Sequence, residues 1–321
     1  NLNGRYNYPQ VYTSWLYLFS ILREQINDET YYMGDDCIKI EQNNDEAIAY
    51  FENGKKKSSD LIIIANGIKS DLRSYVDKSA HPQYAEYVGW RGVVNEEEIS
   101  SKSLETLSNY FIIVLPHNQQ IACYPIAGEG ENPFEIGKRR INWIWYKPIP
   151  TKLLKELLLG KSGQQYEDGI PPNEIRQEII SDLFEEAQNN LPPQLVELVK
   201  ATQQPLIQPI FDLQSMKMHN SRVVTIGDAA FTARPHVGMG VTKAAMDAFK
   251  LSEYLGDNFN LDKLSKWEQL RLKESQFIVN RSRKLGNYLS LPKENENLIM
   301  PNIQNVLKDT AISLYEIEDY Q

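Results

Sequence analysis

Residues 223–248 read VVTIGDAAFTARPHVGMGVTKAAMDA, and this stretch decides the fold. A β-branched run ends at Gly227 and Asp228, a loop with two glycines follows, and an alanine-rich segment then begins a helix. Such a strand delivers a carboxylate at its carboxyl end, beside a helix N-terminus that favours an anionic or oxygen-rich ligand. Gly238 and Gly240 would let that ligand approach the backbone closely. The alternative is an ordinary strand–turn–helix in which Asp228 serves only as a cap.

Three further segments accompany this motif. Residues 60–73 read DLIIIANGIKSDLR, residues 84–94 read YAEYVGWRGVV, and residues 137–146 read GKRRINWIWY. Together with the RPH triplet at 234–236, and in this order along the chain, they resemble the FAD-dependent aromatic hydroxylases, the class A flavoprotein monooxygenases. Within that family they are most similar to the branch that contains 2,6-dihydroxypyridine 3-hydroxylase.

The resemblance implies an α/β fold: a Rossmann-like FAD-binding domain of the p-hydroxybenzoate hydroxylase type, with an inserted sheet-rich substrate domain and C-terminal helices. The expected divisions are 1–82 (first part of the FAD-binding domain), 83–210 (substrate domain), 211–290 (second part of the FAD-binding domain) and 291–321 (helical tail). Residues 61–65 and 223–226 are near-continuous apolar runs, so we predict that they are buried strands of one parallel sheet. Asp228 and Gly238 should then flank one cleft at the carboxyl ends of these strands.

The resemblance also implies which residues bind the cofactor. Asp228 would accept hydrogen bonds from the ribitol hydroxyls, and the N–H groups of the glycine loop would face the flavin N1 and C2=O, where negative charge accumulates on reduction. The segment with Asn66 would lie between the pyrophosphate and the path of the nicotinamide donor. The full expected set is Asn66, Gly67, Arg73, Gly227, Asp228, Pro235, Gly238, Met239 and Gly240, and no metal ligands are expected.

His236 is the one histidine in a motif, and it is the candidate for substrate hydrogen bonding or proton relay; a purely structural or surface role is the alternative. Arg91 could pair with a substrate or cofactor anion, although we expect a solvated or structural ion pair. Trp143 and Trp145 alternate with their neighbours and should share one sheet face, where they either wall an aromatic pocket or pack in the core.

The chain departs from the family pattern in two places. Asn66 stands where the family usually has Asp, which keeps one acceptor but loses the charge. No G-x-G-x-x-G segment is present, and GEGENP at 128–133 contains two carboxylates that would repel a pyrophosphate, so we interpret it as a hairpin loop. Because the chain starts at Asn1, we expect that the first βαβ unit is missing from the sequence, and that the chain as given binds FAD poorly and associates readily.

Local patterns predict the remaining elements. Residues 13–26 carry apolar side chains at helical spacing, and residues 172–184 and 261–288 are also predicted helices. Asn53-Gly54 between two β-prone runs predicts a hairpin turn. A second helical segment is predicted over 294–321.

Composition excludes several classes of function. The 321 residues include 34 Lys and Arg against 43 Asp and Glu, a net charge of −9 that argues against a nucleic-acid partner. Cys37 and Cys123 are the only cysteines, so neither a disulfide framework nor a zinc site is indicated. The longest apolar runs are far too short to span a membrane. We therefore expect a cytoplasmic enzyme with a small-molecule partner, and a homodimer is possible.

The resemblance implies hydroxylation of an electron-rich aromatic or N-heteroaromatic ring. NADH or NADPH would reduce the FAD, O2 would add at the flavin C4a, and the resulting hydroperoxide would transfer oxygen to the ring. Two alternatives stay open: another flavin oxidoreductase of the same fold (an epoxidase, a halogenase or a reductase), and a non-catalytic remnant that does not bind FAD.

Overall fold

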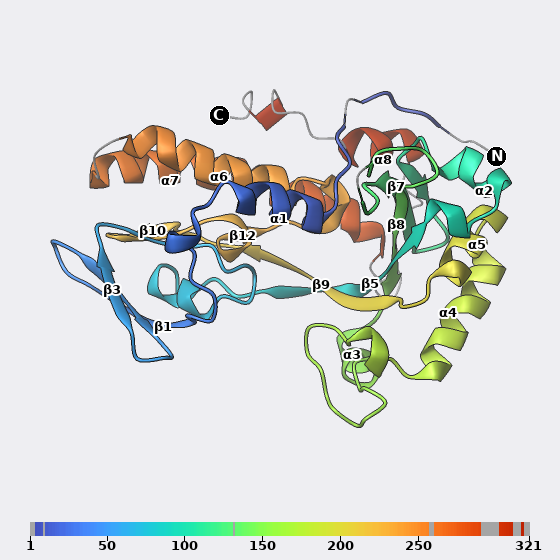
Figure 1. Ribbon diagram of the computed structural model, residues 1–321, viewed down its shortest axis with the longest axis horizontal. Helices are drawn as coiled ribbons and strands as arrows, with labels where there is room; N and C mark the ends of the chain where they lie inside the picture. Colours follow the sequence, from blue (N-terminus) through green and yellow to red (C-terminus); the bar gives the residue numbers. More distant parts are fainter. Residues whose placement is uncertain are drawn as a thin grey trace, which may run out of the picture.

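The computed structural model describes residues 4–8, 10–130, 132–256, 260–289, 302–310 and 316–317. The chain forms two lobes that are joined by the long strands β5 and β9 (Figure 1). The first lobe carries two three-stranded sheets, ordered β1-β2-β3 and β10-β11-β4, and the second carries one six-stranded sheet, ordered β12-β9-β5-β8-β7-β6.

The strands of the first lobe are β1 (Cys37–Gln42), β2 (Ala47–Phe51), β3 (Lys56–Ser59), β4 (Ile62–Ile64), β10 (His219–Asn220) and β11 (Val223–Thr225). Those of the six-stranded sheet are β5 (Gln83–Asn95), β6 (Ile112–Val114), β7 (Gln120–Ile126), β8 (Arg140–Pro148), β9 (Leu206–Gln214) and β12 (Phe231–Thr232). The α-helices are α1 (Trp15–Glu24), α2 (Ser101–Leu107), α3 (Thr151–Leu157), α4 (Gln177–Asn190), α5 (Pro193–Ala201), α6 (Gly240–Leu255), α7 (Leu261–Gly286) and α8 (Ile303–Thr310).

The parallel pairing of the two apolar runs is confirmed. β4 and β11 lie side by side in parallel, with Val223 opposite Ile62 and Thr225 opposite Ile64. β11 is fully buried, as expected. The expectation of a buried strand over 61–65 is wrong for most of the run, because Ile64 alone of these residues is buried and Ile63 is 47% exposed. Both strands deliver their carboxyl ends to the same edge, where the two candidate flavin-binding turns lie.

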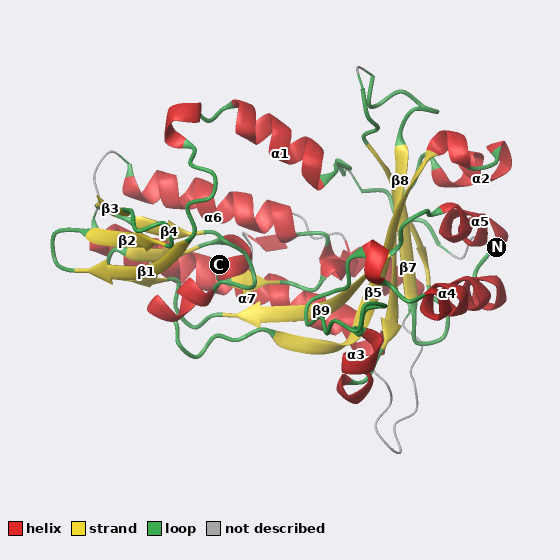
Figure 2. Ribbon diagram, turned by 60° about the horizontal axis from the view of Figure 1, so that its bottom comes forward, coloured by secondary structure: helices red, strands yellow, loops and turns green. Residues whose placement is uncertain are grey.

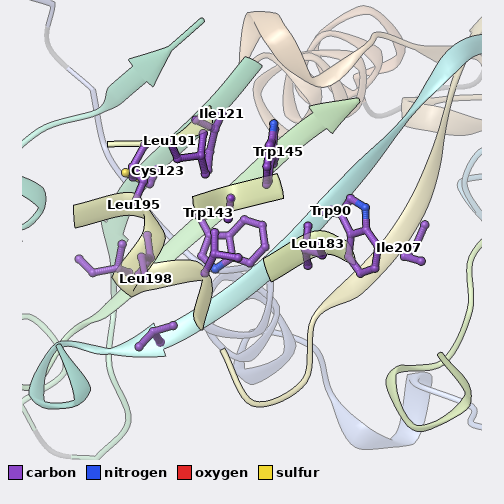
Figure 3. Packing of buried hydrophobic residues seen from close by; sticks show 14 of the residues in the cluster. Trp90, Ile121, Cys123, Trp143, Trp145, Leu183, Leu191, Leu195, Leu198 and Ile207 are labelled. Atoms are coloured by element: carbon purple, nitrogen blue, oxygen red, sulfur yellow. The ribbon is translucent and has the colours of Figure 1, made fainter. Parts of the chain in front are cut away.

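The six-stranded sheet has two different faces. On its outer face, Trp90, Trp143 and Trp145 pack against the helices α2, α4 and α5, which Figure 3 shows as one apolar core. The indole N–H groups of Trp143 and Trp145 donate to Thr202 Oγ1 (2.8 Å) and Gln119 Oε1 (2.9 Å). The two tryptophans therefore share a face, as predicted, and their place is in the core. The inner face carries Tyr87, Ile144 and Tyr146.

The local predictions have mixed outcomes. The Asn53-Gly54 turn joins the antiparallel strands β2 and β3, as predicted. The helix predicted over 172–184 is divided, because a short 3-10 turn at Pro172–Glu174 precedes α4. α1 forms near its predicted place, yet none of its residues is buried, and Figure 2 shows it apart from the sheets.

The loop after β7 is confirmed as a hairpin connection, since β7 and β8 pair in antiparallel, although Glu131 lies outside the described residues. Most of the tail predicted over 294–321 also lies outside them. Among the described residues, no helix is long and apolar enough to cross a membrane, and no cluster of side chains could hold a metal ion.

Candidate functional site

The turn after β11 presents a single carboxylate. Gly227 has a φ of +59°, a left-handed conformation that favours glycine, and it begins the 3-10 turn Gly227–Ala229. Asp228 follows, and its side chain is exposed. Partial burial against this dense turn raises the pKa of Asp228; the charge of Lys243 opposes the rise and that of Asp247 adds to it. The Asp228 carboxylate therefore stays accessible, whereas the turn beneath it is packed.

Two side chains of α6 clamp the Gly227 backbone from below. The Lys243 ammonium donates to the Gly227 carbonyl oxygen (3.0 Å), and the Gly227 N–H donates to Asp247 Oδ2 (2.9 Å). Lys243 and Asp247 are fully buried and form an ion pair (3.2 Å) one helical turn apart. The carbonyl of Gly227 is thus bound by an ammonium group and its N–H by a carboxylate.

The long helix α7 completes this buried ionic network. Arg271 donates from Nε to Asp247 Oδ1 (2.7 Å) and also pairs with Glu274. The Trp267 indole N–H donates to the Asp247 backbone carbonyl (3.2 Å). Two cations and two carboxylates therefore balance, which is the condition under which buried charges are tolerated. Sequence reasoning missed this network, although an i, i+4 Lys–Asp pair in an alanine-rich helix was an available signal.

Arg73 joins the second turn to the first. It is 5% exposed, and its guanidinium donates from Nε to the Ala229 carbonyl (2.6 Å) and from Nη2 to the carbonyls of Gly67 (3.5 Å) and Ile68. The structure thus brings the Asn66-Gly67 turn beside the Gly227 turn. In this arrangement the described contacts of Arg73 are to backbone oxygens, while the Asn66 side chain is exposed.

The glycine loop leaves the N-terminus of α6 open. The 3-10 turn Pro235–Val237 ends at Gly238, which has a φ of +61°, and Met239 caps α6 without a side-chain hydrogen bond. A Cβ atom added to Gly238 or Gly240 would meet no atom within 4 Å. The Gly238 N–H is not available as predicted, because it donates to the Pro235 carbonyl (3.0 Å). The first N–H groups of α6, its positive end and the open space beside the glycines fit an electron-rich ligand that approaches the backbone.

His236 lies behind this loop in a buried polar network. Its Nδ1 lies 2.9 Å from Gln120 Oε1, which also accepts the Tyr288 hydroxyl proton (2.8 Å). Because this amide oxygen only accepts, the proton of the neutral ring is on Nδ1, and Nε2 accepts from the Tyr87 hydroxyl (2.8 Å). Burial, with a contribution from the charge of Arg234, lowers the pKa of His236 to about 3. Both nitrogens are engaged within the protein, so the imidazole is held neutral and fixed in this structure.

A two-residue bulge in β5 places Tyr87. Tyr84 pairs with Phe211 and Val88 with Pro209, so four residues of β5 advance against two of β9. Glu86 within the bulge has a φ of +63°, unusual for a residue with a side chain. The bulge puts Tyr87 on the inner face, beside His236. Sequence reasoning missed Tyr87, Gln120 and Tyr288, because these three residues lie far apart in the chain and meet His236 only in the folded structure.

Comparisons with known proteins point to flavin-dependent hydroxylases, and the matched profile region contains none of the candidate flavin-binding residues. A family profile described as FAD binding domain-like matches residues 84–212. The chain is 27% identical over 282 residues to 2,6-dihydroxypyridine 3-monooxygenase of Paenarthrobacter nicotinovorans, covering 87% of this chain and 69% of that protein. The structure of 2,6-dihydroxypyridine-3-hydroxylase from Arthrobacter nicotinovorans superposes with a TM-score of 0.79 at 25% identity, covering 89% of this chain and 75% of that one. The chain is therefore homologous to 2,6-dihydroxypyridine 3-monooxygenase and to other FAD-dependent aromatic hydroxylases.

More distant members of the family show the same relation. The salicylate hydroxylase of Pseudomonas putida is 26% identical, and the match covers 68% of this chain and 48% of that protein. Klebsiella pneumoniae HpxO, whose structure was solved with FAD and uric acid, shares the fold with a TM-score of 0.68 at 19% identity, covering 94% of this chain and 66% of that one. The chain therefore spans about half to two thirds of the length of several relatives that it matches.

The clamp on Gly227 should be essential for stability. Replacing Lys243 with Met removes the bond to the Gly227 carbonyl and leaves the buried network with an excess negative charge, so we expect a loss of about 3–5 kcal/mol. Lys250→Met is the matched control, because Lys250 lies on the same helix in an exposed pair with Glu253 and should cost less than about 1 kcal/mol. Urea unfolding of both variants measures the difference; equal losses would show that the clamp is dispensable.

Because the pKa of His236 is depressed in the folded state, the protein should become less stable as the pH is lowered. The unfolded chain binds a proton below the ordinary pKa of 6.5, whereas the folded chain does not until pH approaches about 3. Stability from this group is therefore complete above pH 6.5 and is lost on acidification, by about 2 kcal/mol between pH 7 and pH 5. Urea unfolding at both pH values, compared between the unaltered chain and His236→Asn, isolates this share. An unchanged pH dependence in the variant would show that His236 is not the group responsible.

Proposed function

We propose that this chain belongs to an enzyme that hydroxylates an electron-rich aromatic or N-heteroaromatic ring, with FAD as cofactor and NADH or NADPH and O2 as co-substrates. The observation that carries the proposal is the open N-terminus of α6 beside the Gly227–Asp228 turn, since these two features can bind two parts of one flavin. The activities of relatives on dihydroxypyridine, salicylate and urate support the substrate class.

The residues that are present fit the flavin. The exposed Asp228 carboxylate would accept hydrogen bonds from ribitol hydroxyls, and the N–H groups of Met239 and Gly240 would donate to the pyrimidine edge of the ring system. Pro235 lies at the start of this loop, and the Asn66-Gly67 turn is joined to the Gly227 turn through Arg73. When bound, FAD supplies the redox chemistry and the activation of oxygen.

The protein contributes orientation and shielding. The neutral His236 ring, held by Tyr87 and Gln120, keeps the loop in one position against the inner face of the sheet. Tyr146 lies 4.5 Å from the His236 ring, centroid to centroid, so aromatic side chains border the space next to the loop. An apolar, aromatic wall would exclude water from the reaction. We assign residues 1–82 and 211–290 to the flavin-binding part and 83–210 to the substrate part.

Loss of the Asp228 carboxylate should weaken flavin binding. Removing a charged acceptor of two hydroxyl groups costs about 1.5–3 kcal/mol, which is roughly a tenfold or greater rise in the Kd for FAD. The measurement is quenching of flavin fluorescence on titration with protein. Asp182→Ala in α4, which changes an aspartate of the other lobe, is the control. Equal FAD affinity of the unaltered chain and Asp228→Ala would contradict the role of this residue.

The reaction itself is tested with reduced nicotinamide. NADH or NADPH oxidation by the FAD-loaded protein should rise when 2,6-dihydroxypyridine or salicylate is added, and mass spectrometry should find a product that has gained one oxygen atom. A rate of NADH or NADPH oxidation that does not change when the aromatic compound is added would favour a reductase. A complete absence of flavin binding would favour a non-catalytic protein.

A further inference from the structure

Arg91 occupies the inner face of the six-stranded sheet. On β5 it directly follows Trp90, whose side chain is buried in the outer core, so Arg91 points to the opposite face. It pairs across the sheet with Ile144, which belongs to the inner cluster that also contains Tyr87 and Tyr146. Arg91 therefore shares a face with the residues that contact His236.

The positive charge of Arg91 is not compensated by a carboxylate. Among the described residues it forms no ion pair, and its one hydrogen bond runs from Nη1 to the amide oxygen of Gln208 (2.8 Å). Arg140 of the same sheet differs, because it pairs with Glu129, and its neighbour Arg139 pairs with Glu96. The expectation of a structural ion pair for Arg91 is therefore not met in the described part of the chain. A half-buried guanidinium without a counter-ion has unused donors.

Aromatic side chains share this face of the sheet with Arg91. Tyr124 stands on the same face and contacts the rings of Phe111 (5.1 Å, stacked) and Tyr12 (5.6 Å). Burial raises the pKa of both Tyr124 and Tyr146, and the charge of Arg91 opposes this rise at each of them. The cation thus acts on tyrosines on two strands, and one of them, Tyr146, contacts His236.

We propose that Arg91 binds an anionic oxygen of the aromatic substrate, a carboxylate or a ring oxyanion, and so selects substrates that carry one. The inference rests on the proposed function, because it assumes that the ring lies between the inner face and the glycine loop. The planar guanidinium fork matches a carboxylate or a pair of oxygens in one plane, and the neighbouring rings provide stacking surface for the rest of the molecule. Gln208 holds the guanidinium in place without neutralising it.

Salicylate and salicylamide are the probes, because they differ in the charge of one substituent. Binding is measured by isothermal titration calorimetry in slightly acidic buffer, where salicylamide is neutral, with and without FAD. The unaltered chain should prefer salicylate. Arg91→Gln should weaken salicylate binding by roughly tenfold or more, as expected for the loss of a charge-assisted pair, and leave salicylamide binding nearly unchanged. Arg91→Lys, which keeps the charge but loses the fork, should fall between them.

Arg140→Gln is the matched control, because Arg140 lies on β8 in the same sheet but is paired with Glu129. The proposal is overturned if the unaltered chain does not prefer salicylate, if Arg91→Gln retains the preference, or if Arg140→Gln loses it equally. FAD affinity of the same samples separates the two hypotheses. A preference for the anion that depends on Arg91, in a protein that binds FAD but oxidises no NADH or NADPH in response to an aromatic compound, would uphold the anion site and contradict the monooxygenase; aromatic-dependent oxidation without that preference would do the reverse.

Discussion

The candidate flavin site depends on one buried charge, the carboxylate of Asp247. It accepts from the Gly227 N–H and pairs with both Lys243 and Arg271, so it connects the end of β11 to α6 and α7. A carboxylate removed from water is stable only when its oxygens are satisfied by charged or polar donors, and all three partners are needed for that. The Gly227 turn is consequently fixed in position. Asp228, on the exposed side of this turn, is therefore held in place as well.

The second lobe is organised by the period of two in its strands. Trp90 and Arg91 are neighbours in sequence, yet one lies in an apolar core and the other on the face that carries the polar network of His236. Dense packing of the outer face, shown in Figure 3, keeps the sheet in one register. The inner face can therefore hold polar and charged groups, because the outer face supplies most of the hydrophobic stabilisation of this lobe.

His236 illustrates how burial changes the meaning of a motif residue. An imidazole in water titrates near neutral pH and is a candidate for proton transfer. Here Tyr87 and Gln120 engage its two nitrogens and the ring is buried, so the neutral form persists. The structure favours a positioning role for His236, which fixes the glycine loop against the sheet. A bulge in β5, with Glu86 in a left-handed conformation, is what brings Tyr87 to that ring.

The sequence by itself determined the strand–turn–helix of residues 223–248, the parallel pairing of β4 with β11, and the resemblance to the aromatic hydroxylases, because these follow from local patterns of apolar runs, glycines and one carboxylate. Only the tertiary structure decided the rest. The contacts of Arg73 with Ala229 and of Asp247 with Arg271 join residues that are separated in the chain. The residue type alone also does not show whether an arginine side chain is exposed or buried. That Arg91 forms no ion pair with any described residue is likewise a property of its surroundings. Charge compensation depends on which side chains meet in space, and this information resides in the packing of the elements rather than in any one of them.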